Sequence, residues 1–290
     1  MTALVTGGAG FVAAYLADEL KSAGWDVVLT DVKCVRSRDV RLVDLTDAEM
    51  LRELVSQVKP NAVVHLGGIS FVPDAEKYAG ILERVNVGGT RNLISAIEAE
   101  APKSRFLFVS TAQVAHAHLS EYAKSKLAAE KCVHDAAARG LDAIIVRPAN
   151  HTGPGQSPKF VVPSFVKQAV EMKRGVRKKF AVGNLEAVRD FTDVRDVVRA
   201  YRVLLEKGVA DNIYFVGSNA QISIGGLLTL IASTAGVSSE YEVNESLWRA
   251  ADSSPIIDVC AVMALGWRAQ ISLEKTICDM LKANTLLPEV

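Results

Sequence analysis

A glycine-rich turn near the N-terminus constrains the fold of this chain more than any other feature. Residues 2–6 form a short run of apolar and β-branched residues, followed directly by Gly-Gly-Ala-Gly. The next segment, FVAAYLADELKSAG, has apolar residues at helical spacing, which predicts a strand, a tight turn and a helix. Gly8, Gly10 and Ala13 fit the pattern G-x-G-x-x-G/A, in which the first helix amides can hold a pyrophosphate.

An acidic residue at the end of the next apolar run also indicates dinucleotide binding. Asp31 ends the run VVLTD, about 20 residues after the glycines, where a carboxylate can accept hydrogen bonds from the adenosine ribose. The same carboxylate would repel a 2′-phosphate, so NAD(H) is the favoured cofactor. Lys33, Arg36 and Arg38 follow closely and could reverse this preference, so NADP(H) stays open.

Strands and helices alternate through the first half of the chain. Further strands are expected at 40–45, 62–66, 105–110 and 142–148, and helices at 47–58, about 78–100 and 121–139. This alternation predicts an α/β fold of the Rossmann type, with a doubly wound parallel sheet covered on both faces. We expect residues 1–150 to form the NAD(P)-binding domain, with room for later segments to return to it.

The alternation weakens beyond residue 150, where HTGPGQSPKF has the glycines and prolines of a substrate loop. We expect residues 151–290 to form mainly a smaller α/β substrate domain. Its expected elements are helices near 160–174, 225–236 and 272–284, strands near 177–182 and 212–217, and a helix entered from RDFTDVRDVVRAYRVLLEK.

Two arginines of this second part are candidates for binding anionic substrate groups. These are Arg189 and Arg249. The alternative for Arg189 is a structural salt bridge, because three aspartates lie close to it in sequence: Asp190, Asp193 and Asp196.

Tyr122 and Lys126 stand four residues apart in a run of helix-forming residues, so they share one helical face. A lysine ammonium favours the phenolate and is expected to lower the tyrosine pKa from about 10 toward neutrality. Such a pair can exchange a proton with a carbonyl or an alcohol. Alone the pair is a weak signal, because the same spacing occurs on solvated helix surfaces. Thr111, at the end of strand 105–110, adds a hydroxyl that could meet the same oxygen, which indicates hydride transfer.

Other strand-end residues suggest supporting roles. His65 is interpreted as a packed histidine, whereas Gly67 and Gly68 mark a place where the backbone passes close to the cofactor. His116 and His118 have no acidic or sulfur companion nearby, so no metal site is expected.

Charge and composition exclude several classes of partner. With 33 basic and 33 acidic residues, nothing suggests nucleic acid or an anionic membrane as a partner. No apolar segment approaches the roughly 18 residues needed to span a bilayer, and no leader peptide is recognised, so we expect a cytoplasmic protein. The cysteines form no CxxC pair and suggest neither disulfides nor a zinc site: Cys34, Cys132, Cys260 and Cys278.

Taken together, the motifs resemble the extended short-chain dehydrogenase/reductase superfamily of nucleotide-sugar enzymes, over essentially the whole chain. The motifs that carry this resemblance are TGGAGFV, Asp31, the Ser110-Thr111 strand end and Tyr122-Ala-Lys-Ser-Lys126. The branch with GDP-mannose 4,6-dehydratases and GDP-4-keto-6-deoxy-D-mannose reductases is similar in HLGGISFV (65–72), RPANHTGPGQ (147–156), FVV (160–162) and GNLEAVRDFTDVRDVVRAY (183–201).

The resemblance implies roles for individual residues and a homodimer formed through the helices near 78–100 and 121–139. Its catalytic triad would be Thr111, Tyr122 and Lys126. Its NAD(P) contacts would be Gly7, Gly10, Phe11, Val12, Asp31, Asp44, Leu45, Leu66, Gly67, Gly68, Tyr122 and Lys126. Its nucleotide-sugar contacts would be Asn150, Val162, Asn184, Arg189 and Arg249, although Arg249 stands in RAAD where the reductases typically have RPxD.

One departure from the branch selects the reaction. Dehydratases carry acidic residues after the catalytic threonine, because eliminating water needs an acid and a base. Here Ala112 and Gln113 stand there, and neither exchanges a proton at neutral pH. We therefore predict NAD(P)H-dependent reduction of a nucleotide-linked 4-keto-6-deoxy sugar, with GDP-4-keto-6-deoxy-D-mannose favoured. An NAD-retaining nucleotide-sugar epimerase and a non-catalytic dinucleotide-sensing protein remain as alternatives.

Further departures leave the sugar open. Ala115-His116 replaces a usual Tyr-Gly, Ala149 replaces a common Phe, and the loop 112–121 is shorter than usual. These changes could reshape the sugar pocket.

Overall fold

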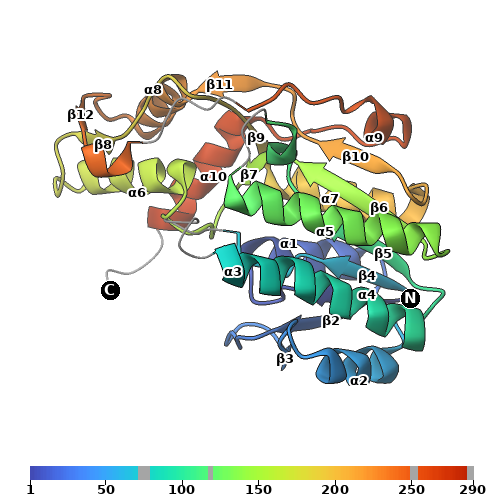
Figure 1. Cartoon of the computed structure of the whole chain (residues 1–290). Coiled ribbons are helices and arrows are strands. Elements are labelled where there is room, and N and C mark those ends of the chain that lie inside the picture. Colours follow the sequence, from blue (N-terminus) through green and yellow to red (C-terminus); the bar gives the residue numbers. More distant parts are fainter. Residues whose placement is uncertain (71–78, 117–119, 249–253, 286–290) are drawn as a thin grey trace. The chain divides into compact units, whose positions relative to one another are not determined.

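The computed structural model describes residues 1–70, 79–116, 120–248 and 254–285 (Figure 1). The chain forms two compact units. The first comprises Met1–Pro148, Val198–Val216 and Asp258–Trp267, and the other described residues form the second.

A seven-stranded parallel sheet organises the first unit, in the order β10-β6-β5-β4-β1-β2-β3. Its strands are β1 (Thr2–Thr6), β2 (Asp26–Asp31), β3 (Val40–Leu42), β4 (Ala62–His65), β5 (Arg105–Val109), β6 (Ala143–Pro148) and β10 (Ile213–Val216). The strand order reverses between β1 and β4, and at such a point the carboxyl ends of the strands leave room for a ligand. The doubly wound α/β fold predicted from the sequence is confirmed.

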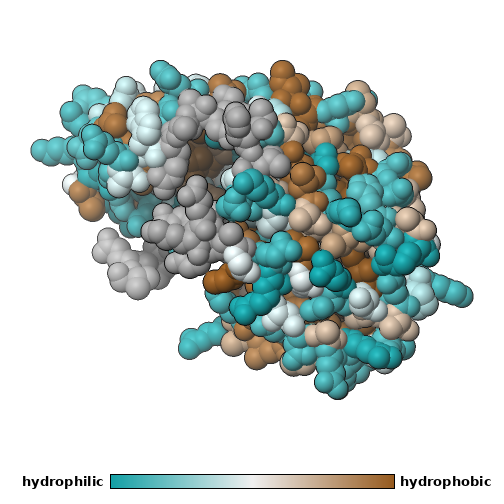
Figure 2. Space-filling view, in the orientation of Figure 1, coloured by the Kyte–Doolittle hydropathy of each residue, from teal (hydrophilic) through white to brown (hydrophobic). Residues whose placement is uncertain are grey.

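Helices cover this sheet on both faces, and in Figure 1 α4 and α5 lie in front of it while α1 lies behind. The helical segments are α1 (Phe11–Ser22), α2 (Ala48–Val58), α3 (Ala79–Leu82), η2 (Glu83–Gly88), α4 (Gly89–Glu100), η3 (Ala112–Ala115), α5 (Glu121–Ala138), α9 (Cys260–Ala264) and, from Val198 on, α7 (Val194–Lys207). Apolar side chains of α2, α4 and α5 pack onto the strands as one core. The outer face over α4 and α5 mixes hydrophilic and hydrophobic residues (Figure 2).

Polar residues define where the helices begin. The Asp47 carboxylate accepts from the amide of Met50 at the start of α2, and the Ser120 hydroxyl accepts from the amide of Ala123 at the start of α5. Each bond satisfies an amide that the first helical turn leaves unpaired. The cap at Ser120 fixes the start of α5 at Glu121, one residue before Tyr122.

The single helix expected over 78–100 is instead interrupted. Its α-helical parts are α3 and α4, and between them Glu83–Gly88 forms a π-helix. Short π-helical turns often occur at functional sites, and this one presents a buried asparagine, Asn86, to the neighbouring loop.

The second unit is built from short strands and three packed helices. One sheet has the order β11-β9-β7 and the other pairs β12 with β8. The strands are β7 (Asn150–Thr152), β8 (Phe180–Val182), β9 (Val188–Asp193), β11 (Gln221–Ser223) and β12 (Tyr241–Val243), with η4 (Glu245–Leu247) after them. The helices α6 (Val161–Lys173), α8 (Ile224–Ala235) and α10 (Leu273–Thr285) share its apolar core.

The strand expected at 212–217 was grouped with the second part of the sequence. It is β10, which lies beside β6 in the large sheet, with Ile213 opposite Ile145. The edge of the parallel sheet is therefore completed by a strand from late in the chain. Within the described residues, no helix has the length and apolarity required to cross a membrane.

Candidate functional site

The glycine turn brings two backbone segments too close together for side chains. Gly7 has a φ of +71°, and a Cβ on it would lie 2.9 Å from the amide nitrogen of Gly67. Gly10 donates its amide to the Gly7 carbonyl at 2.9 Å and precedes the first residue of α1. Among the described residues no side chain caps α1, so the amides of its first turn are placed to bind a phosphate.

One acidic and one basic side chain form hydrogen bonds with the backbone of this turn. The Asp31 carboxylate accepts from the amide of Ala9 at 3.0 Å and from that of Lys33 at 3.2 Å. The Arg38 guanidinium donates to the carbonyls of Gly8 at 2.9 Å and Gly10 at 3.2 Å. Of the three basic residues that follow Asp31, Arg38 is thus shown beside the glycine turn, and it could pair with a 2′-phosphate.

Behind the turn, hydroxyl and imidazole groups form a continuous buried chain. Gly67 donates its amide to Thr6 Oγ1 at 3.0 Å, and Thr6 Oγ1 lies 2.6 Å from His65 Nδ1. His65 Nε2 lies 3.0 Å from Thr90 Oγ1, which donates to the Asn86 carbonyl at 2.6 Å. These directions agree with one tautomer only, in which a neutral His65 accepts at Nδ1 and donates from Nε2.

Burial keeps this histidine neutral. His65 is 1 % exposed, and burial, assisted by the charge of Lys126, lowers its pKa to about 3. An imidazole that stays neutral and has both nitrogens occupied is a structural group. Its interpretation as a packed histidine is confirmed.

Asn86 connects the Gly67-Gly68 loop to α5, and the sequence analysis missed it. Its Oδ1 accepts from the amide of Ile69 at 2.8 Å, and its Nδ2 donates to the Ile69 carbonyl at 3.1 Å and to Ser125 Oγ at 2.9 Å. Ser125 in turn donates to the carbonyl of Tyr122 at 2.8 Å. A Cβ on Gly68 would lie 2.8 Å from Asn86 Oδ1, so the loop requires glycine. An isolated asparagine in an expected helix gave no signal of this role.

The predicted cofactor residues Asp44 and Leu45 lie just after β3. The Asp44 carboxylate accepts from the amide and the hydroxyl of Thr46, at 2.8 and 2.9 Å. Leu45 is half-buried, and its side chain packs so close to Gly67 that a Cβ there would lie 2.9 Å from Leu45 Cδ1. These residues therefore shape the same strand edge as the two glycine segments. Phe11, Val12 and Leu66 are half-buried at this edge.

The structure places the three predicted catalytic residues on two elements that pack together. Tyr122 and Lys126 occupy the first two turns of α5, and Thr111 caps η3, which contacts α5. The Thr111 hydroxyl accepts from the amide of Gln113 at 3.2 Å, so its own proton can be donated to another group. Lys126 is 6 % exposed, and its Nζ lies 4.5 Å from the centre of the Phe108 ring.

The predicted lowering of the Tyr122 pKa by Lys126 is wrong. Burial raises the pKa of Tyr122 to about 12, although part of its side chain is accessible. Burial also lowers the pKa of Lys126 to about 8, against the opposing effect of the Glu130 carboxylate. Desolvation is the main cause of both pKa shifts, because it disfavours the charged form of each group. At neutral pH Tyr122 is therefore protonated, which suits a proton donor.

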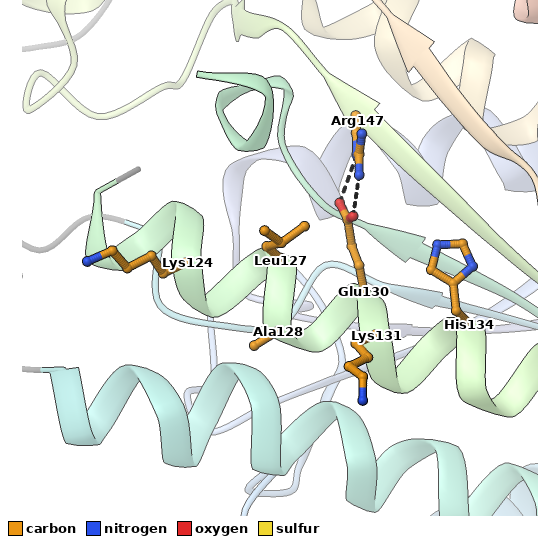
Figure 3. Close-up of a pocket in the computed structure, with 7 residues that line it drawn as sticks. All are labelled: Lys124, Leu127, Ala128, Glu130, Lys131, His134 and Arg147. Atoms are coloured by element: carbon orange, nitrogen blue, oxygen red, sulfur yellow. Dashed lines mark hydrogen bonds and ion pairs between the residues drawn. The ribbon is translucent and has the colours of Figure 1, made fainter. Parts of the chain in front are cut away.

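One helical turn beyond Lys126, a buried carboxylate binds two groups from the strand ends. Glu130 accepts from Arg147 at 3.0 Å on Oε1 and 2.5 Å on Oε2, and the Ser110 hydroxyl also donates to Oε1. Figure 3 shows this pair among the residues that line a pocket of about 490 Å³, together with residues of α5 such as Leu127 and His134. The sequence analysis missed it, because a glutamate four residues after a lysine on a helix has the pattern of an exposed pair.

The predicted substrate residues that the structure describes belong to the second unit. Asn150 begins β7 and lies 3.4 Å from Ser254 Oγ through its Nδ2, while Asn184 Oδ1 accepts from the amide of Glu186 at 2.8 Å. The Val162 side chain is buried in the apolar core of this unit, so only its backbone is suited to contact a ligand. Arg249 lies outside the described residues.

Arg189 lies half-buried on β9 and donates to the carbonyl of Val188 at 2.9 Å. The three aspartates near it in sequence bind other groups. Asp190 accepts from Ser218 and Asn219, Asp193 pairs with Arg195, and Asp196 accepts from the amides of Gln270 and Ile271. None of these bonds involves Arg189.

Comparison with known proteins gives consistent results. The family described as NAD dependent epimerase/dehydratase matches residues 3–217. GDP-6-deoxy-D-mannose reductase of Pseudomonas aeruginosa is 32% identical over 292 residues, which cover 94% of this chain and 93% of the relative. The solved structure of RMD from Pseudomonas aeruginosa complexed with NADPH has a TM-score of 0.85 at 31% identity, covering 97% of this chain and 98% of that one.

The fold also extends to more distant proteins. The UDP-glucose 4-epimerase of Thermus thermophilus, solved in complex with NAD, has a TM-score of 0.85 at 24% identity, covering 99% of each chain. At this identity the likeness concerns the fold alone.

Proposed function

Since this chain belongs to the NAD-dependent epimerase/dehydratase family, a group of extended short-chain dehydrogenases/reductases that use NAD(P), we propose that it reduces a nucleotide-linked 4-keto-6-deoxy sugar. GDP-4-keto-6-deoxy-D-mannose is the favoured substrate, by analogy with the bacterial relative. The observation that carries the proposal is that Tyr122 and Lys126 lie one turn apart on α5, which contacts η3, where Ala112 and Gln113 follow Thr111. That segment supplies no acid or base for dehydration.

In this mechanism each residue has one role at the C4 carbonyl. When bound, NAD(P)H would supply the hydride for C4. Tyr122 donates its phenolic proton to the oxygen, so that the ketone becomes an alcohol. Thr111 donates a hydrogen bond to the same oxygen, because its hydroxyl accepts from the Gln113 amide and keeps its own proton available. Lys126 holds the nicotinamide ribose, and its charge favours the phenolate that forms as the proton leaves.

The cofactor would lie along the strand edge that the glycine segments line. Gly7 and Gly10 let the backbone approach the pyrophosphate, and Asp31 would accept the ribose hydroxyls, which favours NAD(H). NADP(H) remains the second choice, because Arg38 lies at the same turn. The other contacts proposed are Phe11, Val12, Asp44, Leu45, Leu66, Gly67 and Gly68.

The nucleotide sugar would be bound mainly by residues 151–290, as the substrate domain. Arg189 and Arg249 would bind the diphosphate, and Asn150, Val162 and Asn184 would contact the nucleotide sugar. We further propose a cytoplasmic homodimer, with α4 and α5 as the interface. Leu127, half-exposed on α5, supports an interface on that face.

The test is oxidation of NADH and NADPH by the purified protein in the presence of the 4-keto sugar nucleotide. Tyr122→Phe should lower turnover at least about 100-fold, since general-acid catalysis contributes that much. Binding of the dinucleotide should change little. Tyr241→Phe, an exposed tyrosine on β12, is the matched control and should keep full turnover.

Two results would argue against a reductase. Unchanged turnover in Tyr122→Phe would remove the mechanism. NAD+ retained near one per chain after purification, with no net oxidation of added NADH, would favour the epimerase, because that cycle returns its cofactor unchanged.

A further inference from the structure

A buried ionic cluster lies under the helix that carries Tyr122 and Lys126. Its members are Ser110, Glu130 and Arg147, called the charged cluster below. The Glu130 side chain is 2 % exposed and receives both prongs of the Arg147 guanidinium, which is the strongest geometry for such a pair. Figure 3 shows Glu130 pointing from α5 toward Arg147, with its carboxylate facing the guanidinium.

The charged cluster joins three elements at the strand edge where the site lies. Glu130 belongs to α5, Arg147 belongs to β6, and Ser110 is the first residue after β5. Ser110 also donates its amide to the Val146 carbonyl at 2.8 Å, so it is fixed to β6 as well. Because Thr111 follows Ser110 directly and Lys126 lies one turn before Glu130, the carboxylate links the backbones that carry both residues.

Stability alone is a weak explanation for such a pair. Desolvating two charges offsets most of their attraction, and apolar residues of similar volume commonly replace a buried ion pair without loss of stability. In contrast, the Glu130 carboxylate accepts two guanidinium hydrogen bonds from Arg147 and one hydroxyl hydrogen bond from Ser110. These directional bonds fix the rotation of α5 in a way that apolar contacts do not. The Glu130 charge also opposes the effect of burial on the pKa of Lys126.

We propose that Glu130, held by Arg147 and Ser110, is a positioning residue that fixes Lys126 and Thr111 relative to each other for reduction of the sugar. This inference rests on the proposed function. Glu130 acts through its neighbours and touches neither substrate nor cofactor.

The experiment separates positioning from stability with apolar replacements. Glu130→Met and Arg147→Met alone should each lower the melting temperature, because each leaves one charge buried without its partner. The double variant should regain the melting temperature of the wild type. Its kcat should nevertheless stay about 10- to 100-fold low, with KM for the sugar nucleotide within about twofold, because a small misplacement of reacting groups has effects of this size.

Ser110→Ala provides a second variant that keeps the ion pair. It removes only the hydroxyl that joins the carboxylate to the end of β5, so kcat should fall, while the melting temperature should fall less than in either single Met variant because the ion pair remains. The control is the double variant Lys179→Met and Glu240→Met, which removes an exposed ion pair away from α4 and α5 and should leave kcat unchanged. Recovery of kcat together with the melting temperature in the buried double variant, or unchanged kcat in Ser110→Ala, would overturn the proposal.

A binding measurement keeps this test independent of the sugar. Lys126 is proposed to hold the nicotinamide ribose, whereas ADP reaches only the glycine turn and Asp31. The buried double variant should bind NADH about tenfold more weakly and ADP as the wild type does. If the wild type does not reduce the sugar nucleotide, the proposed function fails. The positioning role is rejected separately, if the buried double variant loses the same affinity for NADH and ADP or loses affinity for neither.

Discussion

Two buried polar networks support the same strand edge in different ways. The neutral network consists of Thr6, His65 and Thr90 and ends at the Asn86 carbonyl. The charged cluster consists of Ser110, Glu130 and Arg147. Both connect strand ends to helical segments on one side of the sheet, but the first uses hydroxyls and a neutral imidazole whereas the second uses a full ion pair.

The difference shows what each network can fix. In the neutral network every group has a partner and no charge is desolvated, so it can lie wholly in the interior at little penalty. It supports the glycine segments, where the requirement is close backbone approach. The charged cluster has a directional, two-pronged bond, and it lies beneath the residues whose relative orientation matters for chemistry. Disrupting the charged cluster should therefore lower the free energy of unfolding more than disrupting the neutral network does.

Breaking the charged cluster should have the largest effect on stability. Arg147→Met leaves the Glu130 carboxylate buried without its partner, so the free energy of unfolding should fall by about 3–5 kcal/mol. Urea unfolding of the wild type and the variant measures this. The control is Lys179→Met, which breaks the exposed pair with Glu240 and should lower the free energy by at most about 1 kcal/mol. Equal effects of the two substitutions would mean that Glu130 is solvated or protonated.

Removing the charge next to the cluster should act in the opposite direction. Burial lowers the pKa of Lys126 to about 8, so its protonation at neutral pH disfavours the folded state. Lys126→Met, which is similar in volume, should raise the free energy of unfolding at pH 7 by up to about 3 kcal/mol. The gain should shrink to about 2 kcal/mol at pH 9. At that pH Lys126 is already mostly neutral in the folded protein, so forcing a charge into the interior no longer contributes.

The same urea titrations test this, with the cofactor absent from both samples. Lys126→Met should lose turnover while it gains stability, which is the usual relation between a site residue and the fold around it. A loss of stability in this variant would show that the contact of Lys126 with Phe108 outweighs its burial.

The sequence predicted the large sheet well because its information is local. Each strand is a short apolar run after a turn or helix, and the glycine turn and Asp31 identify the strand edge that would receive a dinucleotide. Which sheet a strand joins depends on its pairing with residues that are distant in sequence. The sequence therefore groups β10 with the second part of the chain, although Ile213 pairs with Ile145.

The errors at the site have the same origin. The π-helical turn within the helix over 78–100 contains Asn86, whose partners Ile69 and Ser125 are distant in sequence. The pKa of Tyr122 rises because of burial, and neither burial nor the direction of the Lys126 side chain can be read from a four-residue spacing. Glu130 was missed for the same reason, because a buried carboxylate and a surface carboxylate look alike in sequence.

The smallest expected effect concerns the neutral network, and it appears only in acid. The pKa of His65 is lowered from 6.5 to about 3 in the folded protein, so below pH 6.5 the unfolded chain binds a proton that the folded one does not. The contribution of His65 is therefore intact above pH 6.5 and is lost as the pH falls toward 3. Between pH 7 and pH 5 this loss amounts to about 2 kcal/mol.

His65→Gln isolates this effect, because its amide can accept from Thr6 and donate to Thr90 but does not titrate. The wild type should lose about 2 kcal/mol more stability than the variant when urea unfolding is repeated at pH 7 and pH 5. Parallel curves for the two proteins would mean that His65 is charged in the folded state. Only the bond between Thr6 and His65 would then be reversed, with Nδ1 donating to the Thr6 hydroxyl, because Nε2 already donates to Thr90 in the neutral form.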